Sequence, residues 1–379
     1  MNELLTFLGE EDRYKKYELF FGPNHPGMNG NFSYIITVEG HTIKRVDPDP
    51  GQLHRGFEKL VEHRLWMQNI SLIPRICVPE PDINELVYSR CVEKLMGIEI
   101  PERAKYIRTI VLEMARINAF LMGFSGISGT TGLYTGSHWT LADRDYFIDL
   151  FEWLTGARVY HMYIIPGGVR RDLPDGWIEK LEETLNYIEK RLSEYDRLIY
   201  NNPIVVQRLK GLAPITQEDA IKYGITGPNL RATGIKYDTR KAVPYAAYEY
   251  LDFDIPVQSD GDGLARAIQR REEFEISINL IRQAIKKMPK KGKIRLDMPN
   301  PLKFRVPKGE VYVKVESARG EHGYYMVSDG GTKPYRMAVR GGSYTAGLVY
   351  ARKALVGMRI EDVALWMATM DICAPDFDR

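Results

Sequence analysis

The pattern of apolar and polar residues along the chain predicts a protein built mostly from helices. The clearest helix lies between residues 101 and 124, where the apolar positions that mark one face are Ile107, Ile110, Val111, Met114, Ile117, Leu121 and Phe124. Asn118 lies on that face, and we expect it to be a core polar group with its hydrogen bonds satisfied. The glycines between residues 123 and 129 are expected to end the helix. Further helices are predicted at 54–70, 81–97, 140–155, 176–200, 262–288 and 360–370.

Strands are predicted near both ends of the chain. Residues 16–47 contain β-prone runs behind a Gly/Pro-rich loop, and residues 310–340 have the pattern of a three-stranded meander. Residues 201–260 are irregular and long for a connection within a compact domain, which is typical of functional or partner-bound segments. The expected fold class is therefore α+β, a central helix bundle with small antiparallel sheets.

We expect three regions in one integrated domain: an N-terminal β region with its Gly/Pro loop (1–50), a helical core (51–300), and a C-terminal meander with a final helix (301–379). Length permits two domains or one large one. No stretch approaches the 18 or so uninterrupted apolar residues of a membrane span.

Composition narrows the class of protein. The 52 basic and 50 acidic side chains nearly balance, which argues against a general nucleic-acid binder. Three cysteines cannot form a secreted disulfide framework, and the first residues lack the basic region and apolar run of a signal peptide. We therefore expect a cytoplasmic protein, with room for a membrane-bound partner.

Two cysteine motifs are the candidate functional site of the chain. Cys77 is followed three residues later by Glu80, and Cys373 is followed three residues later by Asp376. Thiolates are soft ligands, and two such motifs brought together by folding would form one thiol–acid pocket. A single buried cysteine is more often a small apolar residue, and we interpret Cys91 in that way. The residues alone leave both readings open for the other two cysteines.

Eight segments distributed over nearly the whole chain resemble one known family. They are Gly22-Pro-Asn-His25-Pro, Leu53-His-Arg-Gly-Phe-Glu-Lys59, Val92-Glu-Lys-Leu-Met-Gly-Ile-Glu-Ile-Pro-Glu-Arg103, Thr155-Gly-Ala-Arg-Val-Tyr-His161, Pro166-Gly-Gly-Val169, Asn229-Leu-Arg-Ala-Thr-Gly234, Ser317-Ala-Arg-Gly-Glu321 and Tyr324-Tyr-Met-Val-Ser-Asp-Gly330. Together they resemble the 49-kilodalton (NuoD-type) subunit of respiratory complex I, whose superfamily includes the large subunits of group 4 nickel–iron hydrogenases. The resemblance implies a fold like that of the hydrogenase large subunit.

The two cysteine motifs distinguish the branches of this superfamily. In the hydrogenases each motif is Cys-x-x-Cys, and its second cysteine bridges nickel and iron. Glu80 and Asp376 take those positions here, so the resemblance implies no nickel–iron centre and no metal held by this chain. In complex I the cavity binds quinone through a histidine, a second histidine and a tyrosine. His25 matches the first, whereas Asn29 and Val78 replace the other two, which disfavours quinone chemistry.

The chain is most similar to the branch of the archaeal membrane-bound sulfane sulfur reductases, which have lost half of the nickel–iron ligands. This resemblance implies a peripheral subunit on the cytoplasmic side of the cell membrane. Its implied partners are a small NuoB-like subunit with a [4Fe–4S] cluster, other peripheral-arm subunits, ion-pumping membrane subunits, and ferredoxin as the donor to the complex. The implied acceptor is sulfane sulfur, and the reaction is coupled to ion translocation.

Site residues follow from the same resemblance. Cys77, Glu80, Cys373 and Asp376 are the candidate catalytic residues, the two acids as proton donors with pKa values raised by burial. The cysteines are candidates for thiol–disulfide exchange. The expected substrate cavity contains His25, Val78 and Pro79, and Arg75 and His161 are expected beside the partner's cluster.

Alternatives remain for several of these residues. The two acids are equally well explained as ion-paired structural replacements, Arg75 as an interface ion pair, and His161 as a satisfied core histidine. His138 and His322 are interpreted as structural, and His54 and Arg55 match a family motif without an assigned chemistry. Two competing functions are a quinone-reducing complex I-type subunit and a non-catalytic scaffold for the cluster subunit.

Overall fold

The first sheet is a three-stranded antiparallel meander near the N-terminus. A computed structural model describes residues 16–25 and 30–379. The strands β1 (Lys16–Phe21), β2 (Ser33–Glu39) and β3 (Thr42–Asp49) pair in that order. Alternate side chains of β2 are buried, as expected for a strand with one face on a core. They form one hydrophobic cluster with the C-terminal helices, so the two ends of the chain share a core.

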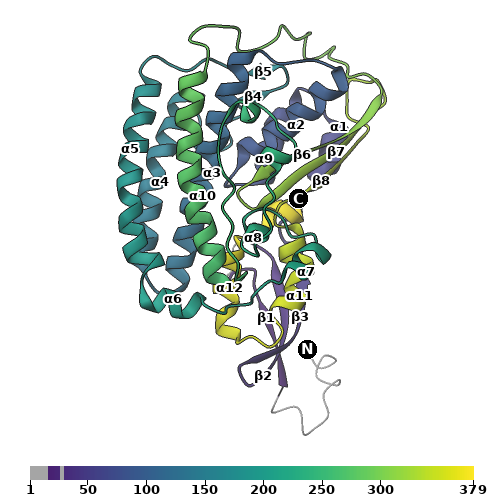
Figure 1. Cartoon of the computed structure of the whole chain (residues 1–379). Helices are drawn as coiled ribbons and strands as arrows, with labels where there is room; N and C mark the ends of the chain where they lie inside the picture. The colour runs from purple at the N-terminus through teal and green to yellow at the C-terminus, as the bar shows by residue number, and fades with distance from the viewer. Residues whose placement is uncertain (1–15, 26–29) are drawn as a thin grey trace.

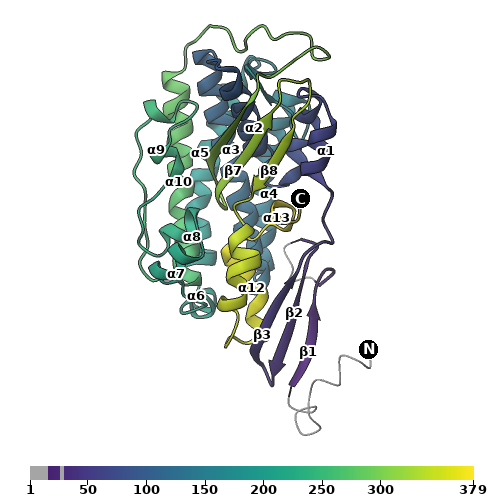
Figure 2. The same ribbon diagram turned by 90° about the vertical axis from the view of Figure 1, so that its right-hand side faces the viewer.

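Four long helices form the bundle at the centre of the molecule. These are α3 (Glu102–Thr130), α4 (Tyr134–Thr155), α5 (Trp177–Tyr195) and α10 (Gly263–Lys287), which stand side by side in Figure 1. Helix α2 (Pro81–Met96) packs between α3 and the second sheet. That sheet is the meander β6 (Gly309–Ser317), β7 (Gly320–Ser328) and β8 (Arg336–Arg340), which lies over α2 in Figure 2. The expected α+β class, with its bundle and small antiparallel sheets, is confirmed.

Shorter elements complete the chain. The short helices are α1 (Phe57–His63), α6 (Pro203–Leu209), α7 (Gln217–Lys222), α8 (Gly227–Arg231), α9 (Thr239–Ala242), α11 (Ala351–Ala354), α12 (Val363–Met370) and α13 (Ala374–Asp378). Strands β4 (Ile164–Ile165) and β5 (Gly168–Val169) form a small hairpin. Single 3₁₀ turns lie at Gln68–Ser71, Ile73–Ile76, Tyr248–Tyr250 and Ile360–Asp362, and π-helical turns at Asp196–Tyr200 and Thr345–Tyr350.

Three predicted helices have a wrong boundary, and one of them is α4, which begins at Tyr134 and not near residue 140. The segment 54–70 holds only the short α1 followed by a 3₁₀ turn. Helix α3 does not end at its glycines but continues through them to Thr130. A Cβ at Gly123 would lie 3.8 Å from the Asp371 carboxyl group, and one at Gly126 would lie 3.8 Å from Ala368. The glycines allow the C-terminal segment to pack closely on α3, and this tertiary packing overrides their low helix propensity.

Helix α3 is also the one helix, among the described residues, that is long and apolar enough to cross a membrane by length and composition. The sequence pattern did not indicate such a segment. Because 89% of its apolar window is buried inside the protein, α3 is the core helix of the bundle. Asn118 is buried on it as expected, but its Oδ1 atom has no hydrogen-bond partner among the described residues, contrary to the prediction of a fully satisfied group.

A buried ion-pair network ties the irregular segment to the bundle. Arg231 Nε donates to Glu273 on α10 at 2.7 Å, and Arg231 Nη1 donates to Glu316 on β6 at 2.8 Å. Arg240 pairs with Glu113 on α3 at 3.2 Å. All five side chains are buried, so each charge depends on its partners for compensation. The segment 201–260 is thus held in place by the chain's own charges.

This network makes a prediction about stability. Arg231→Met should lower the free energy of unfolding by about 3–5 kcal/mol, because it leaves Glu273 and Glu316 buried without their main cation. Lys180→Met is the matched control, since the Lys180–Glu183 pair is exposed and should contribute little. Chemical denaturation of both variants measures the difference. An equally small decrease in unfolding free energy in both variants would contradict the stabilising role of the network.

Candidate active site

The two cysteine motifs meet although nearly 300 positions separate them. Cys77 follows the 3₁₀ turn Ile73–Ile76, and Cys373 lies between α12 and α13. Their Sγ atoms are 3.9 Å apart, and the side chains are 4% and 6% exposed. In each motif the acid lies at a helix start, with Glu80 as the N-cap of α2 and Asp376 in the first turn of α13. The two motifs differ in that Cys373 itself is the N-cap of its helix, whereas Cys77 lies three residues before the N-cap.

A set of hydrogen bonds from the end of β6 and the turn after it holds the Glu80 carboxylate. Its carboxylate accepts from Ser317 Oγ at 2.9 Å and from the Ala318 N–H at 2.9 Å, and Arg319 Nη1 lies at 3.3 Å. Burial raises the pKa of Glu80, and the opposing effects of Arg319 and Arg116 do not cancel this increase. The expected raised pKa is therefore found for this acid.

Asp376 behaves in the opposite way. Its Oδ2 atom accepts from the Ser343 N–H at 2.8 Å, and its Oδ1 atom lies 3.3 Å from His322 Nδ1. Burial acts to raise the pKa of Asp376, but His322, the Ser343 N–H and Arg319 outweigh it, and the pKa is lowered. The expectation that burial raises this pKa is wrong, because burial also brings a ring nitrogen and an N–H donor to the carboxylate.

Arg319 joins the two motifs and was not predicted as a site residue. It lies in the turn between β6 and β7, and its guanidinium contacts Glu80 at 3.3 Å and Asp371 at 3.0 Å. Asp371 adopts a left-handed conformation, with φ 54°, which ends α12 two residues before Cys373. The sequence signal was the arginine of the segment 317–321, placed in a tight turn between two predicted strands.

A cavity of about 310 Å³ opens beside Cys373. Val78 and Pro79 line it, as the sequence analysis expects, together with Met122 and Gly126 of α3 and the side chain of Arg319. His25 was expected there too, but the described lining residues do not include it, and its ring packs 4.1 Å from that of Phe21. Asn29 lies outside the described residues. The cavity combines a thiol, a cation and apolar walls.

The thiol of Cys77 is held in the protonated form. The hydrogen bond with Cys373 and burial raise the pKa of Cys77 well above its usual value, and the charge of Asp376 adds to this effect. Cys91 is buried elsewhere, with its Sγ 3.8 Å from the carbonyl oxygen of Tyr324, which agrees with its interpretation as a structural residue.

The donor atoms do not fit a nickel–iron centre. The carboxylates of Glu80 and Asp376, at the two bridging positions, already accept hydrogen bonds from Ser317, Ala318 and Ser343. A carboxylate is also a harder ligand than the thiolate that the hydrogenases have there. The described part of the chain also has no group of three or more His, Cys, Asp or Glu side chains that could hold a metal ion.

Comparisons with known proteins show the family to which the chain belongs. Residues 130–303 and 301–379 match the family described as respiratory-chain NADH dehydrogenase, 49 Kd subunit. The D subunit of the NADH-quinone oxidoreductase of Thermosipho melanesiensis is 57% identical over 96% of this chain and 99% of its own length. The chain belongs to the 49-kilodalton subunit family.

Two further proteins are similar to the chain over nearly its whole length. Subunit 4 of the Thermus thermophilus NADH-quinone oxidoreductase is 38% identical over 98% of this chain and 96% of its own length. A chain in the structure of the membrane-bound sulfane sulfur reductase, an archaeal respiratory membrane complex, is 47% identical with a TM-score of 0.94. That match covers 97% of this chain and 99% of the other, and it confirms the fold that the resemblance implied.

Arg75 and the residue before His161 contact each other in this member of the 49-kilodalton family. The guanidinium of Arg75 lies 5.1 Å from the ring of Tyr160, the residue before His161. Arg75 is exposed, whereas His161 is buried with its Nδ1 2.9 Å from Asp82 of α2. Burial lowers the pKa of His161, but the charge of Asp82 outweighs this effect and the pKa is raised.

The motif that contains His54 and Arg55 anchors the C-terminus. The N–H groups of Arg55 and Gly56 donate to the carbonyl oxygen of Arg379 at 3.0 and 3.1 Å, and His54 Nδ1 lies 2.8 Å from that of Asp378. These contacts hold the segment that carries Cys373 and Asp376. The motif that contains His54 and Arg55 thus has a structural role, because it fixes the position of the C-terminal segment.

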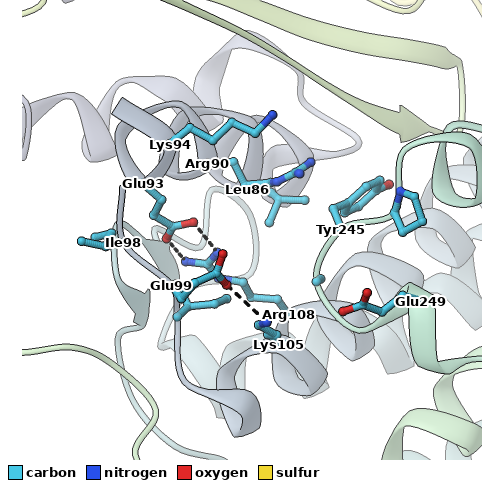
Figure 3. A pocket seen from close by; sticks show the side chains of 13 residues that line it. Leu86, Arg90, Glu93, Lys94, Ile98, Glu99, Lys105, Arg108, Tyr245 and Glu249 are labelled. Atoms are coloured by element: carbon cyan, nitrogen blue, oxygen red, sulfur yellow. Dashed lines mark hydrogen bonds and ion pairs between the residues drawn. The ribbon is translucent and has the colours of Figure 1, made fainter. Parts of the chain in front are cut away.

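A second cavity, of about 230 Å³, lies between α2, α3 and the segment around Tyr245 (Figure 3). Its charges are largely paired, with Arg108 2.6 Å from Glu93 and Lys105 3.4 Å from Glu99. The described residues that line it include neither cysteine of the motifs, whereas Cys373 lines the first cavity.

Gly341 makes a testable contribution to the site. A Cβ at this position would overlap the carbonyl oxygen and Oδ1 of Asp376. Gly341→Ala should therefore displace Asp376 and lower the free energy of unfolding by about 1–3 kcal/mol. Gly129→Ala is the control, because its Cβ would meet Ser137 Oγ at 3.7 Å inside a helix, where alanine is favoured. Denaturation curves in which Gly341→Ala is more stable than Gly129→Ala would contradict the close packing of Gly341 on Asp376.

The lowered pKa of Asp376 predicts a pH-dependent contribution to stability. An acid whose folded pKa lies below its unfolded value of about 3.9 stabilises the fold above that value and loses this effect as the pH falls. The difference in unfolding free energy between wild type and Asp376→Asn should be complete above about pH 5 and shrink below about pH 4. The exposed Asp297→Asn is the control. A difference in unfolding free energy that stays constant down to about pH 3 would contradict the contact of Asp376 with His322.

Proposed function

We propose that this chain is the peripheral-arm large subunit of a membrane-bound respiratory complex and carries the cavity in which sulfane sulfur is reduced. The observation that carries the proposal is the pair of thiols, 3.9 Å apart, one of which, Cys373, lines a cavity that Arg319 also lines. The sequence identity of 47% to a chain of the sulfane sulfur reductase complex supports it.

The chemistry follows from the two cysteines. A thiolate of the pair attacks one sulfur of an S–S bond, and the second cysteine resolves the mixed disulfide. Two thiols leave with the two cysteine protons, and Cys77 and Cys373 are left as a disulfide. Two electrons and two protons then restore the dithiol. The net reaction cleaves one sulfane S–S bond, consumes two electrons and two protons, and gives two thiols.

The electrons come from outside this chain. Under the proposal they pass from ferredoxin to a [4Fe–4S] cluster in a small NuoB-like subunit beside Arg75 and His161, and membrane subunits couple the reaction to ion translocation on the cytoplasmic side. Positive charge near such a cluster raises its reduction potential. Arg75 and the raised pKa of His161 are consistent with this placement.

A second candidate is the reduction of quinone, which the names of the relatives from Thermosipho and Thermus favour. Against it stands Val78, whose apolar side chain lines the cavity where the resemblance places a tyrosine hydroxyl. A third candidate, a scaffold without its own chemistry, leaves the proximity of two buried thiols without a role.

An acceptor assay on the purified complex tests the proposal. With reduced ferredoxin as donor, polysulfide should be reduced and quinone should not. Reduction of quinone alone would overturn the proposal in favour of the complex I-type reading, and reduction of neither acceptor would favour the scaffold.

The thiol pair gives a sharper prediction. Cys77→Ser and Cys373→Ser should each lower polysulfide turnover by more than about tenfold, because serine cannot undergo thiol–disulfide exchange. Cys91→Ser is the matched control, since Cys91 is equally buried but hydrogen-bonds only to Tyr324 among the described residues, and it should retain turnover. Full activity of the first two variants would refute the exchange step.

A further inference from the structure

The connection between α10 and β6 carries a high concentration of positive charge. Residues 286–308, which we call the basic segment, contain nine basic side chains and one acidic side chain, Asp297, and thus have a net charge of +8. The whole chain has a net charge of +2, so all other residues together have a net charge of −6. The basic side chains are Lys286, Lys287, Lys290, Lys291, Lys293, Arg295, Lys303, Arg305 and Lys308.

These nine side chains are all exposed, and almost none is paired. Among the described residues, the one ion pair that any of them forms is Lys293–Asp297, at 3.9 Å between two exposed side chains. Such a pair contributes little to stability. Lys287 donates a hydrogen bond to the carbonyl oxygen of Tyr250 at 2.5 Å. Arg231, by contrast, is buried against carboxylates. The fold therefore does not account for the charges of the basic segment.

The backbone of the basic segment is fixed on the protein although it is irregular. Residues 288–308 form no helix and no strand, and connections of this length are usually functional or bound by a partner. The carbonyl oxygen of Ile294 accepts a hydrogen bond from the Val169 N–H at 3.0 Å, and Phe304 and Val306 are buried in the core. The charges thus lie on an anchored surface, which loses less conformational entropy on binding than a free tail would lose.

The basic segment lies at one end of the molecule. It runs over the end of the bundle that is opposite the N-terminal sheet, where it leads from α10 to β6 (Figure 1). The described residues that line the cavity beside Cys373 include none of its members. The segment is therefore a separate surface, which the proposed sulfur chemistry does not use.

The composition of the basic segment favours a protein with an acidic surface over a lipid or a nucleic acid. Segments that lie on membranes combine their cations with exposed apolar anchors, and proteins that hold single strands stack the bases on aromatic rings. In the basic segment the one exposed large apolar side chain is Leu302, at 70%, and the one aromatic ring, Phe304, is buried. A fixed array of cations instead complements a fixed array of carboxylates, which orients two proteins and speeds their association.

We propose that the basic segment is the docking surface for an acidic protein partner within the respiratory complex. The family of the chain, a subunit of a respiratory complex, provides protein neighbours. The contact is governed by exposed charges, so it should weaken as salt screens them. The inference holds whichever acceptor the complex reduces, and its test measures the composition of the complex and not its turnover.

Crosslinking of the intact complex tests this docking surface. A carbodiimide joins a lysine amine directly to a carboxylate that it contacts, and peptide mass spectrometry identifies both residues. Lys290, Lys291 and Lys293 should be joined to Asp or Glu residues of one other polypeptide. This product should decrease when the salt concentration rises from about 0.1 M to about 1 M. Recovery of these lysines without a link to another polypeptide would overturn the proposal.

A charge-reversal variant measures how much the basic segment contributes. The triple variant Lys290→Glu/Lys291→Glu/Lys293→Glu should retain the crosslinked polypeptide at a level at least about tenfold below wild type, because like charges then face each other. The crosslinking itself uses the unaltered complex, so the proposal can be overturned even if this variant does not assemble.

The matched control reverses three exposed lysines outside the basic segment. Lys190→Glu/Lys210→Glu/Lys236→Glu changes the net charge by the same amount and should retain the polypeptide at the wild-type level. Equal retention in the two triple variants would overturn the proposal.

Two further measurements cover the other classes of partner. The wild-type complex is tested for binding to vesicles that contain phosphatidylglycerol and for nucleic acid that a nuclease removes. Suppose that either one is bound by the wild type and lost in the charge-reversal variant, while the polypeptides of the complex stay the same. The basic segment would then be a lipid or a nucleic-acid surface, and the proposal would be overturned.

Discussion

The site depends on one buried arginine. The Arg319 guanidinium binds Glu80 of the first motif and Asp371 of the C-terminal segment, and all three side chains are buried. Removing one partner of such a group leaves an uncompensated charge in the interior, which is strongly destabilising. Arg319 therefore holds the N-terminal end of α2 and the segment before Cys373 in one place. The contact between the two thiols follows from this constraint.

The two positions at which the resemblance places bridging thiolates carry two acids with different surroundings. Glu80 faces a hydroxyl, an N–H and an arginine, and the cost of burial still raises its pKa. Asp376 faces a histidine ring and an N–H, and its pKa is lowered. The acids of the two motifs thus have pKa values shifted in opposite directions because their neighbours differ. The acid with the lowered pKa is the one that contacts His322.

Periodicity and motif resemblance predicted the fold class, the helices α2 and α10, and the C-terminal meander closely. They also predicted that Cys77 and Cys373 would meet. The continuation of α3 through Gly123 and Gly126 was missed, because it depends on the close approach of Asp371 and Ala368, which are distant in sequence. The roles of Arg319 and His322 were missed for the same reason. Each role is defined by contacts between β7 or its preceding turn and the two ends of the chain.

The most direct test of this account is to trap the two thiols in the intact complex. Mild oxidation followed by alkylation and peptide mass spectrometry shows which cysteines form a disulfide. With their Sγ atoms 3.9 Å apart, Cys77 and Cys373 should be recovered as one linked peptide pair, while Cys91 should be recovered as a free thiol. Recovery of Cys77 and Cys373 as separate alkylated residues, under conditions that oxidise exposed dithiols, would contradict the account.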